Sequence, residues 1–150
     1  ELALELGADV AIDSQAQDMT AAIREANGGK RVDVILDMTG GRITDESVNA
    51  LAPFGRLGFY GQASREAPKP IAPTNLLVHS TTIAGMWLPH AFRLPGNVVG
   101  QAMSELFELA IDDQLRVVAG GEYALADARL AHEALRSRGT TGKLVLNPQL

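Results

Sequence analysis

Glycine residues follow two runs of β-forming residues in this 150-residue sequence, at positions where a ligand could reach the main chain. Gly40 comes directly after Thr39, and Gly61 comes directly after Tyr60. At the carboxyl end of a parallel strand, a residue without a side chain lets a dinucleotide approach the backbone closely. Glycine is also the commonest turn residue after a strand, and this plainer interpretation is the more frequent one. The sequence leaves both interpretations open.

A small basic group could contact a phosphate. It consists of Arg136, Arg138 and Lys143, near the end of the last expected helix. Cations at a helix C-terminus interact favourably with the helix dipole. An arginine can equally hold a phosphate group through two parallel hydrogen bonds. The two roles are about evenly supported.

The histidines His79, His90 and His132 have no cluster of further donors around them in the sequence. Zinc needs several convergent ligands, so we expect no metal site in this chain. The sequence has no Cys and no Gly-x-Ser-x-Gly nucleophile elbow. We therefore assign no catalytic residue to it.

Alternating strand and helix patterns must position these residues. The apolar β-formers of Val32–Met38 indicate a strand that is covered on both faces, as in a parallel sheet. Their order with the other elements predicts an α/β fold with a doubly wound, mostly parallel, Rossmann-like sheet. The other expected elements are strands at Asp9–Asp13, Arg56–Tyr60, Thr81–Trp87 and Lys143–Leu146, helices at Asp18–Asn27, Thr44–Leu51, Val98–Ile111 and Asp127–Arg136, a surface excursion at Gln62–His79, and an extended stretch at Leu115–Tyr123.

The first residues look like the end of a helix. The segment Glu1–Leu6 has helical composition without a preceding N-cap, and Gly7 is the expected left-handed residue that closes it. No Gly-x-Gly-x-x-Gly motif stands between a strand and a helix in the sequence. We therefore expect residues 1–150 to be a single partial dinucleotide-binding domain, incomplete at its amino-terminal end. Its first strand, its glycine loop and a catalytic domain would lie upstream.

The composition narrows the classes of partner. The net charge is −5 and no long run of like charges occurs, which argues against nucleic acid and anionic membranes as partners. No apolar stretch reaches the roughly 18 residues of a membrane span. The absence of Cys fits a reducing compartment, so we expect a cytoplasmic protein with a small-molecule substrate.

Several short motifs occur in a fixed order along the chain. They are Leu6-Gly7-Ala8-Asp9, Val32 to Asp37 with Gly40-Gly41, Gly55-Arg56-Leu57 with Tyr60-Gly61, Ala131-His132, and Thr141 to Pro148. Together they resemble the medium-chain dehydrogenase/reductase superfamily. The similarity runs over nearly the whole chain and is greatest to the carboxyl-terminal, cofactor-binding portion of the zinc-free, quinone oxidoreductase-like branch.

This resemblance implies binding of NADP, with NAD as the alternative. Many NADPH-dependent members have Tyr where this sequence has Ser14, which weakens the expected contact with adenosine. Arg138 matches an arginine that approaches the cofactor in quinone reductases. The implied cofactor-binding residues are Ser14, Thr39, Gly40, Gly61, Gln62, Met86, Trp87, Leu88 and Arg138.

The resemblance also implies hydride transfer from NAD(P)H to a quinone, an enone or an enoyl thioester. The chain alone should not turn over substrate, because the catalytic residues would belong to an upstream domain. A homodimer through the strand Thr81–Trp87 is implied, with the competing interpretation that Trp87 merely covers the core. Two other functions stay open, a fragment of a zinc-dependent NAD alcohol dehydrogenase and a non-catalytic nucleotide-binding module.

Overall fold

The computed structural model describes residues 1–137 and 139–150, and it contains two compact units. The first unit is Glu1–Val98 and the second is Val99–Leu150. The expectation of a single partial domain stays a prediction. None of the helices in the described residues has the length and apolar character that crossing a bilayer requires.

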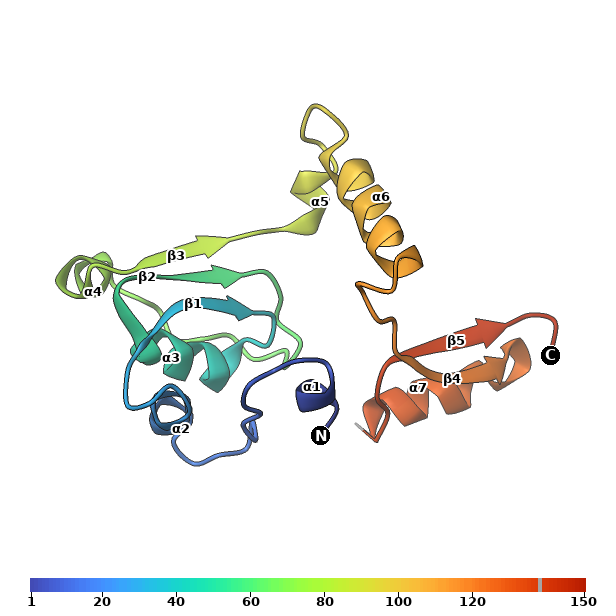
Figure 1. The fold of residues 1–150 in the computed structure, drawn as a ribbon, viewed down its shortest axis with the longest axis horizontal. Helices are drawn as coiled ribbons and strands as arrows, with labels where there is room; N and C mark the ends of the chain where they lie inside the picture. The colour runs from blue at the N-terminus through green and yellow to red at the C-terminus, as the bar shows by residue number, and fades with distance from the viewer. Residues whose placement is uncertain (138) are drawn as a thin grey trace. The chain divides into compact units, whose positions relative to one another are not determined.

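A three-stranded parallel sheet forms the centre of the first unit (Figure 1). Its strands β1 (Val32–Asp37), β2 (Leu51–Phe59) and β3 (Thr82–Gly85) lie in that order. The helix α3 (Gly41–Ala50) connects β1 to β2, and the connection from β2 to β3 contains α4 (Pro73–His79). Because all three strands run in the same direction, their carboxyl ends share one edge of the sheet. The predicted parallel α/β architecture is confirmed.

The core of this unit lies between the sheet and two helices. Leu51 and Leu57 of β2 are fully buried, and α3 contacts both β1 and β2. The helix α2 (Met19–Ala26) packs against α3. Asp18 caps α2 by accepting a hydrogen bond from the Ala21 amide at 2.8 Å, as the sequence predicts. Two layers of helix therefore cover one face of the sheet.

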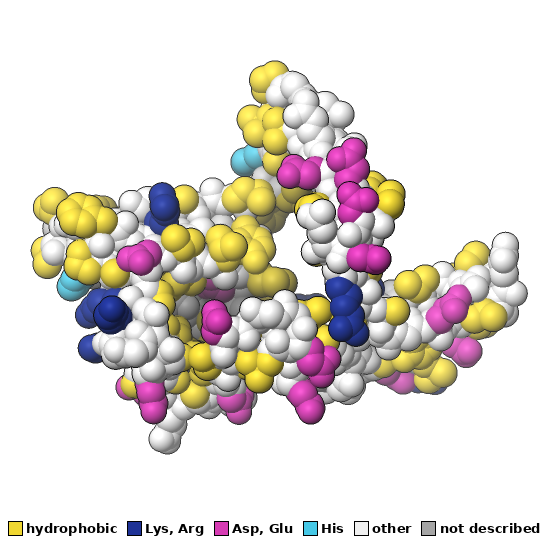
Figure 2. All heavy atoms as spheres, viewed as in Figure 1, with side chains coloured by type: hydrophobic (Ala, Val, Ile, Leu, Met, Phe, Trp, Pro, Cys, Tyr) yellow, Lys and Arg dark blue, Asp and Glu magenta, His cyan; other side chains and the backbone are white. Residues whose placement is uncertain are grey.

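The other face of β1 is open, which corrects the prediction of a strand covered on both sides. Val34 and Leu36 have exposed fractions of 53% and 74%. Both side chains point away from the face that α3 covers, because side chains alternate along a strand. Apolar side chains are accordingly visible over this unit in Figure 2.

Two local predictions differ from the structure. The run Asp9–Asp13 is irregular, because a strand exists only through hydrogen bonds to a neighbour and none of the described strands pairs with this run. The expected turn before Arg56 lies inside β2 as a bulge, so that Val32 pairs with Leu51 but Val34 pairs with Arg56. At the bulge, Phe54 has a φ of 65° and donates its amide to the Ser80 carbonyl at 2.7 Å.

The ends of the first unit follow the predictions more closely. The short helix α1 (Leu2–Glu5) ends before Gly7, which has a φ of 98°. The excursion after β2 is irregular as far as Ala72 and then forms α4. After β3 the chain forms the single-turn helix α5 (Leu88–Ala91).

The second unit contains a βαβ arrangement of its own. Its strands β4 (Ala119–Ala124) and β5 (Lys143–Asn147) are parallel, with Tyr123 opposite Leu146. The helix α7 (Ala128–Arg136) connects them after the 3-10 turn Leu125–Asp127 and buries Ala131. The helix α6 (Val98–Ile111) matches its predicted bounds, but none of its residues is buried.

Candidate functional site

A buried carboxylate organises the end of β1. Asp37 is 3% exposed and accepts hydrogen bonds from the amides of Thr39 at 2.7 Å and Gly40 at 3.4 Å. Its second oxygen accepts from the Thr44 hydroxyl at 2.5 Å. Asp37 thereby fixes both the turn after β1 and the first part of α3. Sequence reasoning missed this role, although Asp two residues before Thr is a typical composition for a side-chain-stabilised turn.

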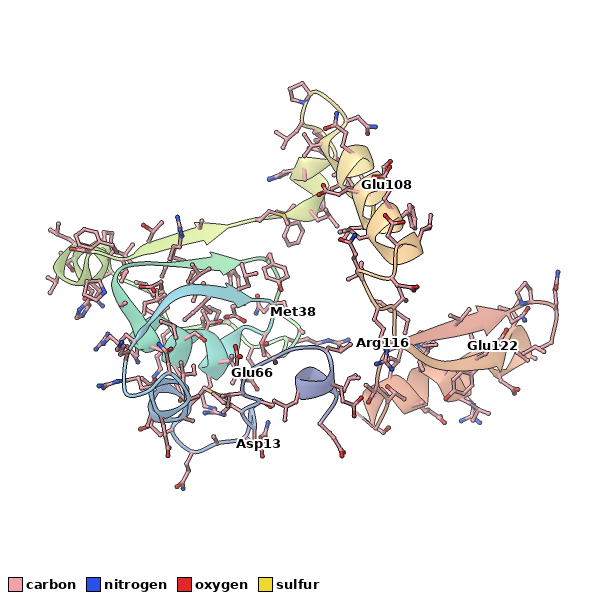
Figure 3. All side chains as sticks on the ribbon, in the orientation of Figure 1. Asp13, Met38, Glu66, Glu108, Arg116 and Glu122 are labelled. Atoms are coloured by element: carbon pink, nitrogen blue, oxygen red, sulfur yellow. The ribbon has the colours of Figure 1, made fainter. Side chains whose placement is uncertain are left out.

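The chain that leaves β2 runs alongside this turn. Its amides at Tyr60, Ala63 and Ser64 donate hydrogen bonds to the carbonyls of Asp37, Met38 and Thr39, at 2.8 to 2.9 Å. Figure 3 shows Met38 at the end of β1, with Glu66 beside the start of α3. These bonds bring the predicted residues Gly61 and Gln62 next to Thr39 and Gly40.

The protein itself requires glycine at both strand ends. Gly40 has a φ of 82°, and an added Cβ would lie 2.7 Å from Gln62 Cγ and 3.0 Å from the Glu66 carbonyl oxygen. A Cβ on Gly61 would lie 2.9 Å from the Met38 carbonyl oxygen. A side chain is disfavoured at Gly40 by the positive φ and at Gly61 by the short contact with a backbone oxygen. These constraints support the turn interpretation of the two glycines, and a ligand contact at either one stays a prediction.

The third strand end lies at the same edge of the sheet. The Met86 amide donates a hydrogen bond to the Phe59 carbonyl at 2.9 Å, directly after β3. Trp87 is 67% exposed, and Met86 and Leu88 are also exposed. The interpretation of Trp87 as a cover of the core is therefore wrong for the described chain.

Together these strand ends form what we call the strand-end ledge, a mixed surface of apolar side chains and polar groups. The apolar members would pack against planar rings, and the amide and hydroxyl groups would orient a polar ligand by hydrogen bonding. This composition fits a dinucleotide, whose rings and polar groups alternate. The strand-end ledge consists of Met38, Thr39, Gln62, Met86, Trp87 and Leu88.

Ser14 is attached to the helix that follows Gly40. Arg42 of α3 donates hydrogen bonds to the carbonyls of Ser14 at 2.7 Å and Ala16 at 3.1 Å. The loop before α2 is thereby fixed to the first turn of α3. Sequence reasoning did not identify Arg42, and only its spacing of four residues from Glu46 could have indicated a role.

Glu46 completes this connection between α2 and α3. Its carboxylate accepts hydrogen bonds from Arg42 and Met19 at 2.5 Å and from the Thr20 amide at 3.2 Å. Desolvation acts to raise the pKa of Glu46. The hydrogen bonds from Arg42, Met19 and Thr20 outweigh it and hold the pKa below its ordinary value.

Arg138 lies outside the described residues. Its neighbours in the predicted basic group, Arg136 and Lys143, lie at the end of α7 and the start of β5 in the second unit. Their role in phosphate binding stays a prediction.

The histidines occupy three different helices, with His79 in α4, His90 in α5 and His132 in α7. Within residues 1–137 and 139–150, no three His, Cys, Asp or Glu side chains come close enough to hold a metal ion. These residues do not offer a zinc ligand set, and we derive no chemical step through zinc.

A parallel α/β unit whose strands end at one edge of the sheet is typical of the Rossmann-like class of folds. The sequence comparisons then identify the family, because residues 6–146 match the zinc-binding dehydrogenase family. This chain belongs to that family.

Two curated relatives show the extent of the match. A 2-haloacrylate reductase from a Burkholderia species is 30% identical over 99% of this chain. A quinone oxidoreductase from Salmonella typhimurium is 32% identical over 97% of the chain. The chain spans 45% of the length of each.

Solved structures have the same fold. A mycobacterial protein, Rv1454c, complexed with NADPH is 33% identical and superimposes with a TM-score of 0.80, covering 97% of this chain and 46% of its own. The crystal structure of a 2-haloacrylate reductase superimposes with a TM-score of 0.81 at 31% identity, covering 99% of this chain and 46% of its own. The predicted superfamily is confirmed.

Proposed function

We propose that this chain is the cofactor-binding portion of an oxidoreductase that transfers hydride from NADPH to a conjugated acceptor, with NADH as the alternative donor. The main support for this proposal is that three parallel strands end at the strand-end ledge, which has both apolar and polar side chains. The likeness to a protein solved with NADPH, over 97% of this chain, supports it. When bound, the nicotinamide supplies the hydride.

The residues of the chain would bind and orient this cofactor. Thr39 and Gln62 offer hydrogen-bonding groups, and Met86 and Trp87 offer apolar surface that excludes water from the ring. The proposed contacts are those expected from the sequence: Ser14, Thr39, Gly40, Gly61, Gln62, Met86, Trp87, Leu88 and Arg138.

The acceptor would be a quinone, an enone or an enoyl thioester. Relatives named as quinone oxidoreductase and 2-haloacrylate reductase both imply an acceptor with a polarised double bond. We place the catalytic residues outside this chain, which spans less than half of these relatives, and expect the chain alone to be inactive.

The test uses a protein in which this chain is joined to the rest of its polypeptide. NADPH fluorescence should report saturable binding, and Gln62→Ala should weaken that binding about tenfold if one strong hydrogen bond is lost. Gln101→Ala, on the helix α6, is the control substitution of the same type outside the ledge. Equal NADPH affinity for Gln62→Ala and the control would place the cofactor elsewhere.

We also propose that the parent protein forms a homodimer by pairing the free edges of β3 across a two-fold axis. Within the described residues β3 pairs only with β2, and an unpaired apolar edge is a hazard unless another strand covers it. A cytoplasmic location is proposed with it, supported by the absence of Cys from the sequence.

A further inference from the structure

A pocket of about 480 Å³ lies at the amino-terminal edge of the first unit's sheet. Its lining includes Arg31, directly before β1, Leu51, which begins β2, and Thr81, directly before β3. Because the strands are parallel, this edge is opposite the strand-end ledge. The six residues of β1 separate the two edges by roughly 20 Å. A ligand in this pocket would therefore not touch the strand-end ledge.

One part of the pocket wall is apolar. Val48 of α3, Leu76 of α4 and Ile71, just before α4, line it together with the buried Leu51. Its volume falls within the range of about 300 to 1,000 Å³ that is usual for small-molecule sites. Such walls suit a short hydrocarbon segment.

The charged groups of the pocket leave one net positive charge. The lining contains two cationic residues, Arg31 and Lys69, and one anionic residue, Asp45, with His79 counted as neutral. The pocket lining is therefore positively charged, whereas the whole chain has a net charge of −5. Figure 2 shows Lys and Arg side chains beside a His in this part of the first unit.

Backbone contacts hold these charges in place. The guanidinium of Arg31 donates a hydrogen bond to the Leu51 carbonyl at 3.0 Å, which fixes it at the start of β1. The Lys69 amide donates to the Asp45 carboxylate at 2.8 Å, which fixes Lys69 over α3. That bond engages one oxygen of Asp45 and leaves the side chain of Lys69 available for a ligand.

We infer that this pocket binds a small amphipathic monocarboxylate. Its carboxylate would accept hydrogen bonds from Arg31 and Lys69, and its alkyl chain would pack against Val48, Ile71 and Leu76. One net positive charge matches one carboxylate better than a doubly charged phosphate. The site is distinct from the proposed cofactor site, and a ligand here leaves NADPH binding possible.

Calorimetry with the 150-residue chain tests the ligand chemistry, with hexanoate as the probe. We expect saturable binding with a Kd on the order of 1 mM, because the ligand has few heavy atoms. Hexanol has the same alkyl chain without the charge, and inorganic phosphate has charge without the chain, so each should bind at least about tenfold more weakly. Equal affinity for phosphate would mean that an inorganic anion is the ligand. Equal affinity for hexanol, or no saturation by hexanoate, would overturn the proposal.

Two matched substitutions locate the binding. Lys69→Met should weaken hexanoate binding about tenfold, whereas Lys30→Met removes the same charge from a residue outside the pocket lining and should leave it unchanged. NMR provides a second readout, because His79 lines the pocket. The chemical shifts of its imidazole ring should change when hexanoate is added to the unsubstituted chain. Equal affinities of the two variants, with no change at His79, would place the bound hexanoate elsewhere. Gln62→Ala should not affect this site, so failure of the cofactor proposal would remain distinguishable.

Discussion

The hydroxyl of Thr44 donates a hydrogen bond to the carboxylate of Asp37 at 2.5 Å, and both side chains are 3% exposed. This bond joins the last residue of β1 to α3, the helix that begins four residues later. The same carboxylate accepts from the Thr39 amide, so the position of the strand-end ledge depends on a buried group. A hydrogen bond to a buried charge is worth more than one between neutral groups, because the dielectric around it is low.

Thr44→Val should therefore lower the free energy of unfolding by about 1.5 to 3 kcal/mol, since it removes one hydrogen bond to a buried carboxylate. The measurement is urea denaturation followed by circular dichroism. Thr74→Val, the same substitution at an exposed position of α4, is the control and should change stability by less than about 0.5 kcal/mol. Equal effects of the two substitutions would show that the bond contributes nothing.

Gly61→Ala should destabilise the chain by about 1 to 3 kcal/mol, because its Cβ would lie 2.9 Å from the Met38 carbonyl oxygen. Gly85→Ala is the matched control at the end of the neighbouring strand, where a Cβ meets nothing within 4 Å. It should be neutral in the same denaturation experiment. A tolerated Gly61→Ala would mean that the two strand ends can separate without cost.

The regular elements of this fold could largely be predicted from the sequence, because their signals are local. Asp18 marks the start of α2, and the apolar spacing in α6 gives its bounds as Val98–Ile111. The sequence also predicted that the strands of the first sheet are parallel, because helical patterns separate them along the chain. The errors arose in segments whose structure depends on pairing with another segment of the chain. Asp9–Asp13 has β-forming residues but no paired strand in the described chain.

The sequence predicted which strand-end residues lie near one another, but it did not predict their hydrogen bonds. The residues Thr39, Gly40, Gly61 and Gln62 do come together, because parallel strands end at one edge. Asp37 was seen only as part of an apolar strand pattern, and its hydrogen bond to Thr44 spans seven residues. Such a contact cannot be identified from residue types alone. The pocket at Arg31 and Lys69 was missed for the same reason, since its lining comes from separate elements.

The stability contributed by Glu46 should depend on pH. Its pKa is lowered in the folded chain, so its contribution is fully present above the ordinary value of 4.5 and is lost as the pH falls through the folded-state pKa. Glu46→Gln should therefore be less stable than the unsubstituted chain at pH 7. The difference should shrink below about pH 4.5 in thermal unfolding experiments.

The chain offers a matched control for this experiment. Arg129 and Glu133 of α7 form an ion pair with the same spacing as Arg42 and Glu46, but it is more exposed. Exposed pairs contribute little, so Glu133→Gln should leave stability nearly unchanged at pH 7. If Glu133→Gln costs as much as Glu46→Gln, the backbone hydrogen bonds at Met19 and Thr20 are not the cause.

The proposed homodimer can be tested at a single residue of β3. Because the Met86 amide points to β2, and alternate amides of a strand point to opposite edges, the Gly85 amide points to the free edge. Gly85→Pro removes this outward donor and keeps the bonds to β2. Gly85→Ala retains the donor and serves as the control.

In sedimentation velocity measurements on the parent protein, Gly85→Pro should be monomeric and Gly85→Ala should be dimeric. Circular dichroism spectra of both variants should match the unsubstituted protein, which separates loss of pairing from loss of folding. A Gly85→Pro protein that remains dimeric would show that the subunits associate through another surface.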